Sequence, residues 1–437
     1  MLSLEYLSRL IFRVSSPFLD WTLKNLSSSQ RIHSLLKARE DKHFRRINGL
    51  KRILIIAGIN IGDAIMAQSF ISPLKKSHPE IEISYLYQRR GYPLIRANPC
   101  VDQHFPLIKS IGYPSKSDFK NLKKVIENYN FDLIFNFCPY FSSKDFKSAQ
   151  TVVIYPTRLI ANVINAYASN ESRAQILFQM NRFANECIEN ISPGAQEWIE
   201  DCSAFASNVI YVNEERMLRA KRIIERLNIN PRSKKILFNP DTSCSYTRIP
   251  FEFQVELIKG ILSVNNITLL LSCGFSLPNI EKELFKEISP SLTKKITVIP
   301  KDTPIDVFAS LIDHSLMFIT GDTAPLHIAA ARRVTVDSDN YFRNSTAVVG
   351  IFGATSGKIY GYDSYSDAYL PSAQDAPSKI FEANPDCKNL TCIDKIFKAC
   401  PEVRCFDGLE PGPIVDYIRD YLSWDLNPCN RVHEAFF

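Results

Sequence analysis

Asp63 is an acidic residue placed where an apolar run gives way to the next element of structure. It follows Gly62 and comes shortly after the run 52–56. A carboxylate at such a turn has two interpretations. It caps the following helix by accepting hydrogen bonds from backbone N–H groups, or it faces a substrate and removes a proton as a general base. These residues alone leave both interpretations open.

The segment 319–331, ITGDTAPLHIAAA, combines the end of a strand, a polar turn and the start of a helix. Asp322 and Thr323 supply side-chain oxygens, and Pro325 is typical of a first helical turn. The free N–H groups of that turn suit a phosphate or diphosphate, and His327 lies beside them. The alternative is a capped helix with a structural histidine.

Two more loops that follow apolar runs are polar. The loop within 238–250 carries four hydroxyl side chains and ends at Arg248. Hydroxyls, backbone N–H groups and one cation can form a phosphate cradle without the P-loop spacing. The segment 351–358 offers Gly353 and Thr355 for a close approach to a ligand. The hydroxyl residues of the first loop are Thr242, Ser243, Ser245 and Thr247.

Short apolar runs alternate with helical stretches along the chain, in two sets. Near-continuous apolar strands with helices between them are typical of parallel sheets covered on both faces. A length of 437 residues favours two domains, and the charged amphipathic stretch 212–230 lies between the sets. The expected strands are 52–58, 82–88, 131–137 and 151–155 in the first set, and 235–240, 267–274, 296–300, 316–322 and 348–354 in the second.

Ligands of open α/β sheets bind beyond the carboxyl ends of the strands. Asp63 and Asp322 follow strands of different sheets, so two domains that face one another would gather both carboxylates in a cleft between them. We expect a basic helical N-terminal extension over 1–50, a first Rossmann-like domain over 51–208, a second over 209–410, and a terminal helix over 411–437 that packs back across the domains.

Positive charge is concentrated at the start of the chain. The net charge is +6, and residues 1–52 carry 11 Lys and Arg against 4 Asp and Glu, so the remainder is nearly neutral. A neutral body argues against nucleic-acid binding. The leader contains no uninterrupted apolar run of about 18 residues, so no transmembrane helix is predicted. Its basic and apolar residues suit an anionic membrane surface; the alternative is a helix packed on the body.

Eleven cysteines without a recognisable signal peptide are typical of reduced thiols in the cytosol. Cys387, Cys392, Cys400 and Cys405 are spaced C-x4-C-x7-C-x4-C. Structural zinc sites usually show C-x2-4-C pairs. We expect packed thiols in this loop-rich segment, with a metal site as the alternative. The seven histidines form no pair at helical spacing, and no metal or cofactor is predicted.

Taken together, these motifs resemble those of the heptosyltransferases, the family 9 glycosyltransferases. The Gly-Asp turn of that family is matched by residues 61–63, and its Asp-Thr-Gly-x-x-His signature by the segment 322–330, DTAPLHIAA. Its Asn-Pro-Gly-Ala-Ser and Leu-Phe-Gly-Pro-Thr loops are approximated by residues 239–243 and 351–355. The similarity extends over about residues 51–425.

The resemblance implies a GT-B fold, an α/β class in which two Rossmann-like doubly wound domains face one another across a cleft. The acceptor-binding domain comes first and the nucleotide-sugar-binding domain second. The implied enzyme is an inverting, metal-independent glycosyltransferase that needs no cofactor. Its donor would be a nucleotide sugar, usually ADP-heptose, and its acceptor a glycolipid or oligosaccharide of the lipopolysaccharide core or another cell-envelope glycan. It would be cytoplasmic, with the leader on the inner face of the membrane.

The family pattern also implies roles for individual residues. Asp63 would be the general base. The residues implied to bind the nucleotide sugar are Thr242, Ser243, Thr247, Arg248, Asp322, Thr323, Ala324, Leu326, His327, Gly353 and Thr355.

This chain departs from the family pattern at three places. Thr247 stands where the family has a phosphate-binding Lys, which leaves Arg248 to supply the charge, and Ala324 replaces a Gly. The segment 332–350 is longer than the usual link. Two alternatives therefore stay open: a catalytically inactive scaffold that binds nucleotide or glycan, and a transferase that uses another nucleotide sugar. A Rossmann oxidoreductase is disfavoured because no G-x-G-x-x-G follows either first strand.

Overall fold

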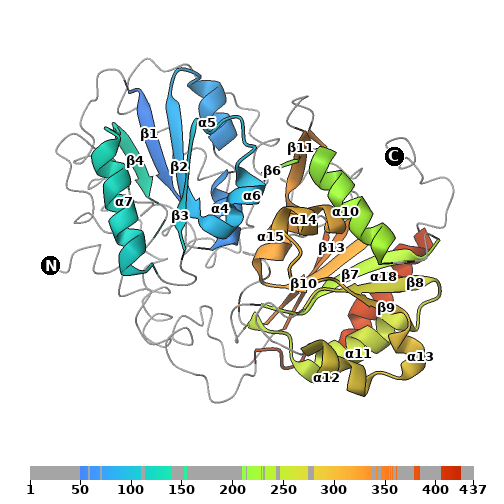
Figure 1. Ribbon diagram of the computed structural model, residues 1–437. Helices are drawn as coiled ribbons and strands as arrows, with labels where there is room; N and C mark the ends of the chain where they lie inside the picture. Colours follow the sequence, from blue (N-terminus) through green and yellow to red (C-terminus); the bar gives the residue numbers. More distant parts are fainter. Residues whose placement is uncertain are drawn as a thin grey trace.

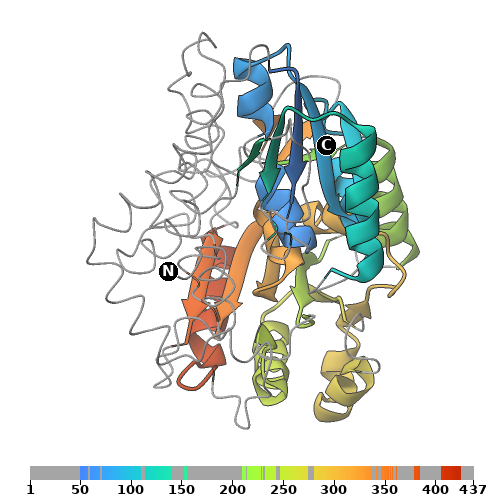
Figure 2. The ribbon, with the colours of Figure 1, turned by 90° about the vertical axis from the view of Figure 1, so that its left-hand side faces the viewer.

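Two parallel sheets flanked by helices form the body of the molecule (Figures 1 and 2). The computed structural model describes residues 50–57, 60–68, 71–109, 114–136, 138, 141, 152–154, 209–212, 214–227, 229, 232–242, 247–273, 280–335, 341–342, 346–353, 355, 357, 361, 378–383 and 405–424. The mixed α/β class predicted from the sequence is confirmed. The predicted helical leader, residues 1–50, lies outside the described residues except for Leu50.

The first sheet has five parallel strands in the order β3-β2-β1-β4-β5. Helix α7 covers one face, and α4, α5 and α6 lie on the other (Figure 1). The strands are β1 Arg52–Ile56, β2 Glu82–Gln88, β3 Gln103–Ile108, β4 Leu133–Asn136 and β5 Val152–Ile154. The helices are α4 Ile61–Ala67, α5 Ile71–Ser77, the 3₁₀ turn η2 Arg89–Gly91, α6 Tyr92–Ile95 and α7 Lys116–Asn128.

The second sheet has six parallel strands in the order β14-β13-β10-β7-β8-β9. The strands are β7 Lys234–Asn239, β8 Ile267–Leu271, β9 Ile296–Val298, β10 Met317–Gly321, β13 Ala347–Phe352 and β14 Ser378–Glu382. The helices are α10 Glu214–Arg226, α11 Phe251–Leu262, α12 Ile280–Glu287, α13 Pro290–Thr293, α14 Ile305–Asp313, α15 Ala324–Ala330 and α18 Pro411–Trp424.

Both sheets are doubly wound, because the chain starts in the middle of each and builds outward in both directions. β1 lies between β2 and β4, and β7 lies between β8 and β10. The strand order therefore reverses beside β1 and beside β7, and ligands of such sheets bind at these switch points.

All nine strands predicted for the two sheets are present, and the strands that were not predicted lie at sheet edges or in a third sheet. β3 and β14 are edge strands whose side chains are mostly half-buried. β3 also contains Pro106, which is tolerated at an edge because it cannot donate to a ladder. Such strands do not show the continuous apolar run that identified the central ones.

A third sheet of three short strands involves the long segment 332–350. β11 Arg332–Thr335 pairs antiparallel with β12 Tyr341–Phe342 and parallel with β6 Val209–Val212. β6 is the first described strand after β5 of the first sheet. β11, which belongs to this long segment, therefore holds β6, the strand with which the second half of the chain begins.

The facing helical layers of the two large sheets share one apolar cluster. In β1, Ile53 and Ile55 point into this cluster, whereas Leu54 and Ile56 point toward α7. Leu237 of β7 and Phe318 of β10 reach the same cluster from the second sheet. On the outer face of the second sheet, α11, α12 and α18 enclose a separate core. The inner layers thus pack on one another.

Helix α18 packs against α11, and its apolar stripe, predicted from the sequence, is buried in the outer core of the second sheet through Ile414, Val415 and Ile418. Lys234 at the start of β7 donates to the carbonyl of Leu422 at 3.1 Å. Within the described part of the chain, no helix has the length and apolar character needed to cross a membrane.

We predict that Gly260 sets the distance between α11 and α18. A Cβ at position 260 would lie 2.4 Å from Cγ2 of Val415, and the β-branched valine has little rotamer freedom to turn aside. Gly260→Ala should lower the free energy of unfolding by about 1–3 kcal/mol, measured by urea denaturation.

Gly412→Ala is the matched control, because a Cβ there meets nothing within 4 Å. It should change stability less than Gly260→Ala does, because only its chain neighbours are close; Pro413 follows it and disfavours a helical conformation for a preceding residue with a Cβ, so alanine gains little there. Equal effects of the two substitutions would contradict the packing argument.

Candidate active site

The carboxyl ends of β7 and β10 are locked together at the switch point of the second sheet. The Asn239 side-chain amide donates to Oγ1 of Thr320 and to the carbonyl of Asp241, both at 3.0 Å. The Thr320 hydroxyl returns a hydrogen bond to the carbonyl of Asn239 at 3.0 Å. Asn239 and Thr320 are buried. The sequence analysis missed this pair, although a polar residue at the end of each apolar run is a signal that could have found it.

The loop after β7 brings two predicted hydroxyl residues together. Oγ1 of Thr242 and Oγ1 of Thr247 lie 3.0 Å apart, and both side chains are buried. Arg248 follows and is half-buried, and its buried Nε finds no hydrogen-bond acceptor among the described residues. Ser243, the fourth predicted member of this loop, lies outside the described residues. The loop thus combines a paired set of hydroxyls with a guanidinium nitrogen that still has hydrogen-bonding capacity.

The loops after β10 and β13 meet through a side-chain hydrogen bond. Thr355 donates to Oδ2 of Asp322 at 2.7 Å. Thr323 is the N-cap residue of α15, and its side chain makes no capping hydrogen bond. Ala324 is the first residue of that helix. Asp322, Thr323 and Thr355, all predicted site residues, therefore lie at one place.

Two other predicted site residues have clear packing environments. Leu326 is buried in the apolar cluster shared by the two sheets. At Gly353, a Cβ would lie 2.6 Å from the carbonyl oxygen of Cys405, so the loop after β13 is packed directly on the turn before α18.

Asp63 is the third residue of α4 and not its N-cap, which corrects the position of the cap expected from the sequence, but its carboxylate still contributes to capping the helix. Oδ2 of Asp63 accepts a hydrogen bond from the backbone N–H of Asn60 at 3.1 Å. A carboxylate at the third helical position reaches back to the cap residue in this way in a capping box. The helix begins at Ile61, earlier than expected, because Asn60 already accepts from Ala64 N at 3.1 Å.

The surroundings of Asp63 include a buried phenol. Tyr85 of β2 is fully buried and donates from its hydroxyl to the carbonyl of Ala64 at 2.6 Å. Burial raises the pKa of Tyr85 well above its ordinary value, and the nearby Tyr87 and Asp63 raise it further. Tyr85 therefore stays protonated and holds the first turns of α4 in place. The role of Tyr85 was not predicted, because Tyr85 lies within a largely apolar strand whose residues are expected to be buried in the core.

The Gly-Asp turn of the first sheet and the histidine of the second lie in direct contact. Helices α4 and α15 are side by side in both views (Figures 1 and 2). A Cβ at Gly62 would lie 2.6 Å from Cδ2 of His327 and 3.3 Å from Nε2. His327 is only 5% exposed. A second link between the halves joins Ser72 Oγ to the Tyr211 hydroxyl at 2.8 Å. The structure thus places Asp63 next to the helix that carries Asp322 and Thr323 at its start.

The predicted thiol cluster is described only at Cys405, which is buried. Cys387, Cys392 and Cys400 lie outside the described residues. Among the residues that the structure describes, no group of three or more His, Cys, Asp or Glu side chains is arranged to hold a metal ion.

Comparison with known proteins identifies the class of molecule. Residues 206–368 match the model of glycosyltransferase family 9 (heptosyltransferase). The chain shares its fold with a family 9 glycosyl transferase from Veillonella parvula, with a TM-score of 0.61 and 15% identity over 87% of this chain and 99% of that one. It also resembles the E. coli ADP-heptose lps heptosyltransferase II, with a TM-score of 0.50 and 13% identity over 86% and 99% of the chains.

Among curated proteins, the chain is 22% identical over 298 residues to Lipopolysaccharide heptosyltransferase 3 of Escherichia coli strain K12, covering 67% of this chain and 80% of that protein. These findings confirm the resemblance to the heptosyltransferases of glycosyltransferase family 9 and the prediction of a glycosyltransferase enzyme. The matched segment contains the loops after β7, β10 and β13.

We predict that Gly62→Ala separates α4 from α15, because the added methyl group would overlap the imidazole of His327. The free energy of unfolding should fall by about 1–3 kcal/mol. A double-mutant cycle with His327→Ala tests the contact. Removing the imidazole should make room for the methyl group, so the two effects should be non-additive by about 0.5–3 kcal/mol. If the two changes in the free energy of unfolding, measured by urea denaturation, are additive, the methyl group does not press on the imidazole and the packing argument is wrong.

Proposed function

We propose that this chain is an inverting, metal-independent glycosyltransferase that moves a heptose from ADP-heptose onto an acceptor of the lipopolysaccharide core or another cell-envelope glycan. The observation that carries the proposal is the family 9 match over residues 206–368, which contains Arg248 and the linked loops at Asp322 and Thr355. The names of the relatives supply the donor and the acceptor class. The enzyme would act in the cytoplasm, with residues 1–50 on the inner membrane surface.

In this proposal Asp63 is the general base. The acceptor hydroxyl loses its proton to the Asp63 carboxylate as its oxygen attacks the anomeric carbon of the sugar, and the bond from that carbon to the diphosphate breaks. The hydrogen bond from Asn60 to Oδ2 fixes the carboxyl group on α4. The contact between Gly62 and His327 keeps the base beside the donor loops, and such positioning is a large part of transferase catalysis.

The departing nucleoside diphosphate carries negative charge away from the sugar and needs groups already in place to stabilise it. Arg248 supplies the cation that Thr247 cannot, and Thr323 and the hydroxyls at Thr242 and Thr247 supply hydrogen bonds. Asp322, held by Thr355 at 2.7 Å, orders the loop. Ser243, Ala324, Leu326, His327 and Gly353 complete the proposed donor site.

A catalytically inactive scaffold is the second candidate. The hydroxyls of Thr242 and Thr247 bond to one another, so position 247 is occupied by a neutral, already partnered group where the family has a lysine. A transferase that uses another nucleotide sugar is also compatible with the same loops. Measurements of nucleotide binding and of sugar transfer distinguish both candidates from the main proposal.

Arg248→Ala should weaken nucleoside diphosphate binding about tenfold or more, because a charge-assisted hydrogen bond to phosphate is lost. The measurement is calorimetric titration with ADP, UDP, GDP and CDP, with and without Mg²⁺. The matched control is Arg232→Ala, at the start of the same sheet, which should leave affinity unchanged. Selective binding of ADP without Mg²⁺ supports the proposed donor, whereas selection of another nucleotide replaces it.

Asp63→Asn should lower the rate of sugar transfer by about 100-fold or more, because an amide cannot accept the proton. The dissociation constant for the preferred nucleotide should not change, since Asp63 acts on the acceptor. The assay follows nucleotide release in the presence and absence of a heptose-deficient lipopolysaccharide acceptor. Full turnover by the variant would remove Asp63 from the mechanism, and an inactive wild-type protein that still binds nucleotide would favour the scaffold.

A further inference from the structure

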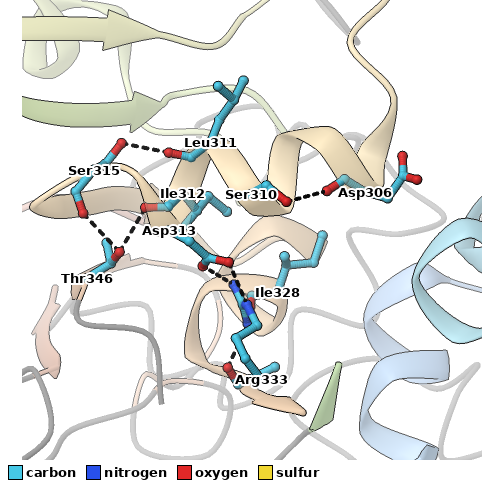
Figure 3. Close-up of polar contacts among 10 residues, drawn as sticks. Asp306, Ser310, Leu311, Ile312, Asp313, Ser315, Ile328, Arg333 and Thr346 are labelled. Carbon is cyan, nitrogen blue, oxygen red and sulfur yellow. Dashed lines mark hydrogen bonds and ion pairs between the residues drawn. The ribbon is translucent and has the colours of Figure 1, made fainter. Parts of the chain in front are cut away.

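Arg333 is the largest fully buried side chain of the described residues, at 0% exposure. It lies in β11, within the segment 332–350 that is longer than the family pattern. A guanidinium stays charged at any ordinary pH, so its burial demands partners for its N–H groups. Figure 3 shows that the side chain reaches between the ends of α14 and α15.

The contacts of Arg333 join those two helices. Nε donates to Oδ2 of Asp313 at 3.0 Å and Nη2 to Oδ1 at 2.7 Å, a two-pronged pairing with the last residue of α14. Nη1 donates to the carbonyls of Ile328 at 2.9 Å and Ala331 at 2.7 Å. The last carbonyls of a helix have no donor within the helix. Arg333 satisfies the carbonyl of Ala331, the C-cap residue of α15. It is a second donor to the carbonyl of Ile328, which also accepts from the backbone N–H of Ala331 at 3.3 Å, and it adds a favourable positive charge at this helix end.

The end of α14 is itself fixed, so Asp313 is a firm support. The Thr346 hydroxyl lies 2.8 Å from the carbonyl of Ile312 and 2.9 Å from that of Ser315, and the Ser315 hydroxyl donates to Leu311 at 2.9 Å (Figure 3). α14 also packs in the apolar cluster through Val307 and Phe308. Movement of α15 relative to α14 would therefore break the bonds of Arg333 first.

From this geometry we propose that Arg333 is a positioning residue for the donor site, which it serves by clamping the C-terminal end of α15 to α14. α15 has seven residues, so fixing its last turn fixes the whole helix. Its start carries Thr323 and Ala324, and His327 on it touches Gly62. The proposal rests on the proposed function for its link to donor binding, but the clamp itself does not.

A stabilising ion pair is an insufficient explanation of this arrangement. Buried ion pairs often contribute little to stability compared with apolar residues of similar size. The four hydrogen bonds use the planar fork of arginine, which lysine cannot reproduce although it carries the same charge. The clamp interpretation therefore predicts a specific local effect of Arg333→Lys.

The matched control is Arg216→Lys. Arg216 is also buried, at 3% exposure, and its Nε lies 3.3 Å from Oδ2 of Asp306, on the same helix α14. Its Nη1 donates to the carbonyl of Tyr211 at 3.2 Å, and none of these contacts involves α15. Both substitutions thus replace a buried guanidinium that pairs with an aspartate of α14, and the contacts that Arg333→Lys removes are those that join α14 to the end of α15.

The first readout is amide hydrogen exchange. In Arg333→Lys, amides of residues 326–331 should exchange on the order of tenfold faster than in the wild type, because this segment opens more readily. Arg216→Lys should leave these amides unchanged. Unaltered exchange of 326–331 in Arg333→Lys, or equal acceleration throughout both variants, would overturn the clamp.

The second readout is ADP binding and transfer from ADP-heptose. Arg333→Lys should weaken ADP binding and raise KM for the donor by about tenfold to 100-fold, with kcat affected less, whereas Arg216→Lys should match the wild type. Faster local exchange with wild-type ADP affinity would refute the role in the donor site. A wild-type protein that binds no ADP would refute the proposed donor instead, and the exchange experiment would still decide whether Arg333 clamps α15.

Discussion

The contact between α4 and α15 is the constraint on which the rest of the arrangement depends. Each large sheet must bury the apolar helices on its inner face, and each does so against the helices of the other, in one continuous cluster. At the centre of that junction the imidazole of His327 lies against the backbone of Gly62. Any side chain at position 62 would overlap the imidazole. The glycine of the Gly-Asp turn is thus required by packing. Its neighbour Asp63 is brought beside α15 as a consequence.

The central strands could be predicted because a strand that is buried on both faces of its sheet has a continuous run of apolar residues. β1, β7 and β10 each contain a buried apolar run, at 53–56, 236–238 and 317–319, and the polar turns that follow them predict the ligand-binding edge. β3, β14 and the three short strands of the third sheet were missed for the opposite reason. β3 and β14 have mostly half-buried side chains and short apolar runs, and β6 pairs with β11, which is far away in the sequence. Their pairing follows from tertiary structure, which no local pattern encodes.

The candidate site also has one part that could be predicted from the sequence and one part that could not. Asp63, Asp322 and Arg248 were predicted as site residues from their types and positions, because carboxylates and a cation that follow apolar strands suit proton transfer and phosphate binding, and their roles stay predictions. The contacts that position them were not predictable. Tyr85 donates to α4 from a neighbouring strand, and Arg333 joins the ends of two helices; both contacts depend on how separate elements pack together. A residue that only positions another residue cannot be distinguished in the sequence from any other buried residue.

The pairing of β6 with β11 has a consequence for building hybrid enzymes. β6 begins the second half of the chain, yet its ladder partner lies more than a hundred residues later, directly after α15. Ile210 is opposite Arg333 in that ladder. A chimaera that joins the first half of one relative to the second half of another must therefore take β6 and β11 from the same parent. A crossover placed after β6 would mismatch the strand that holds Arg333, even if both halves were otherwise intact.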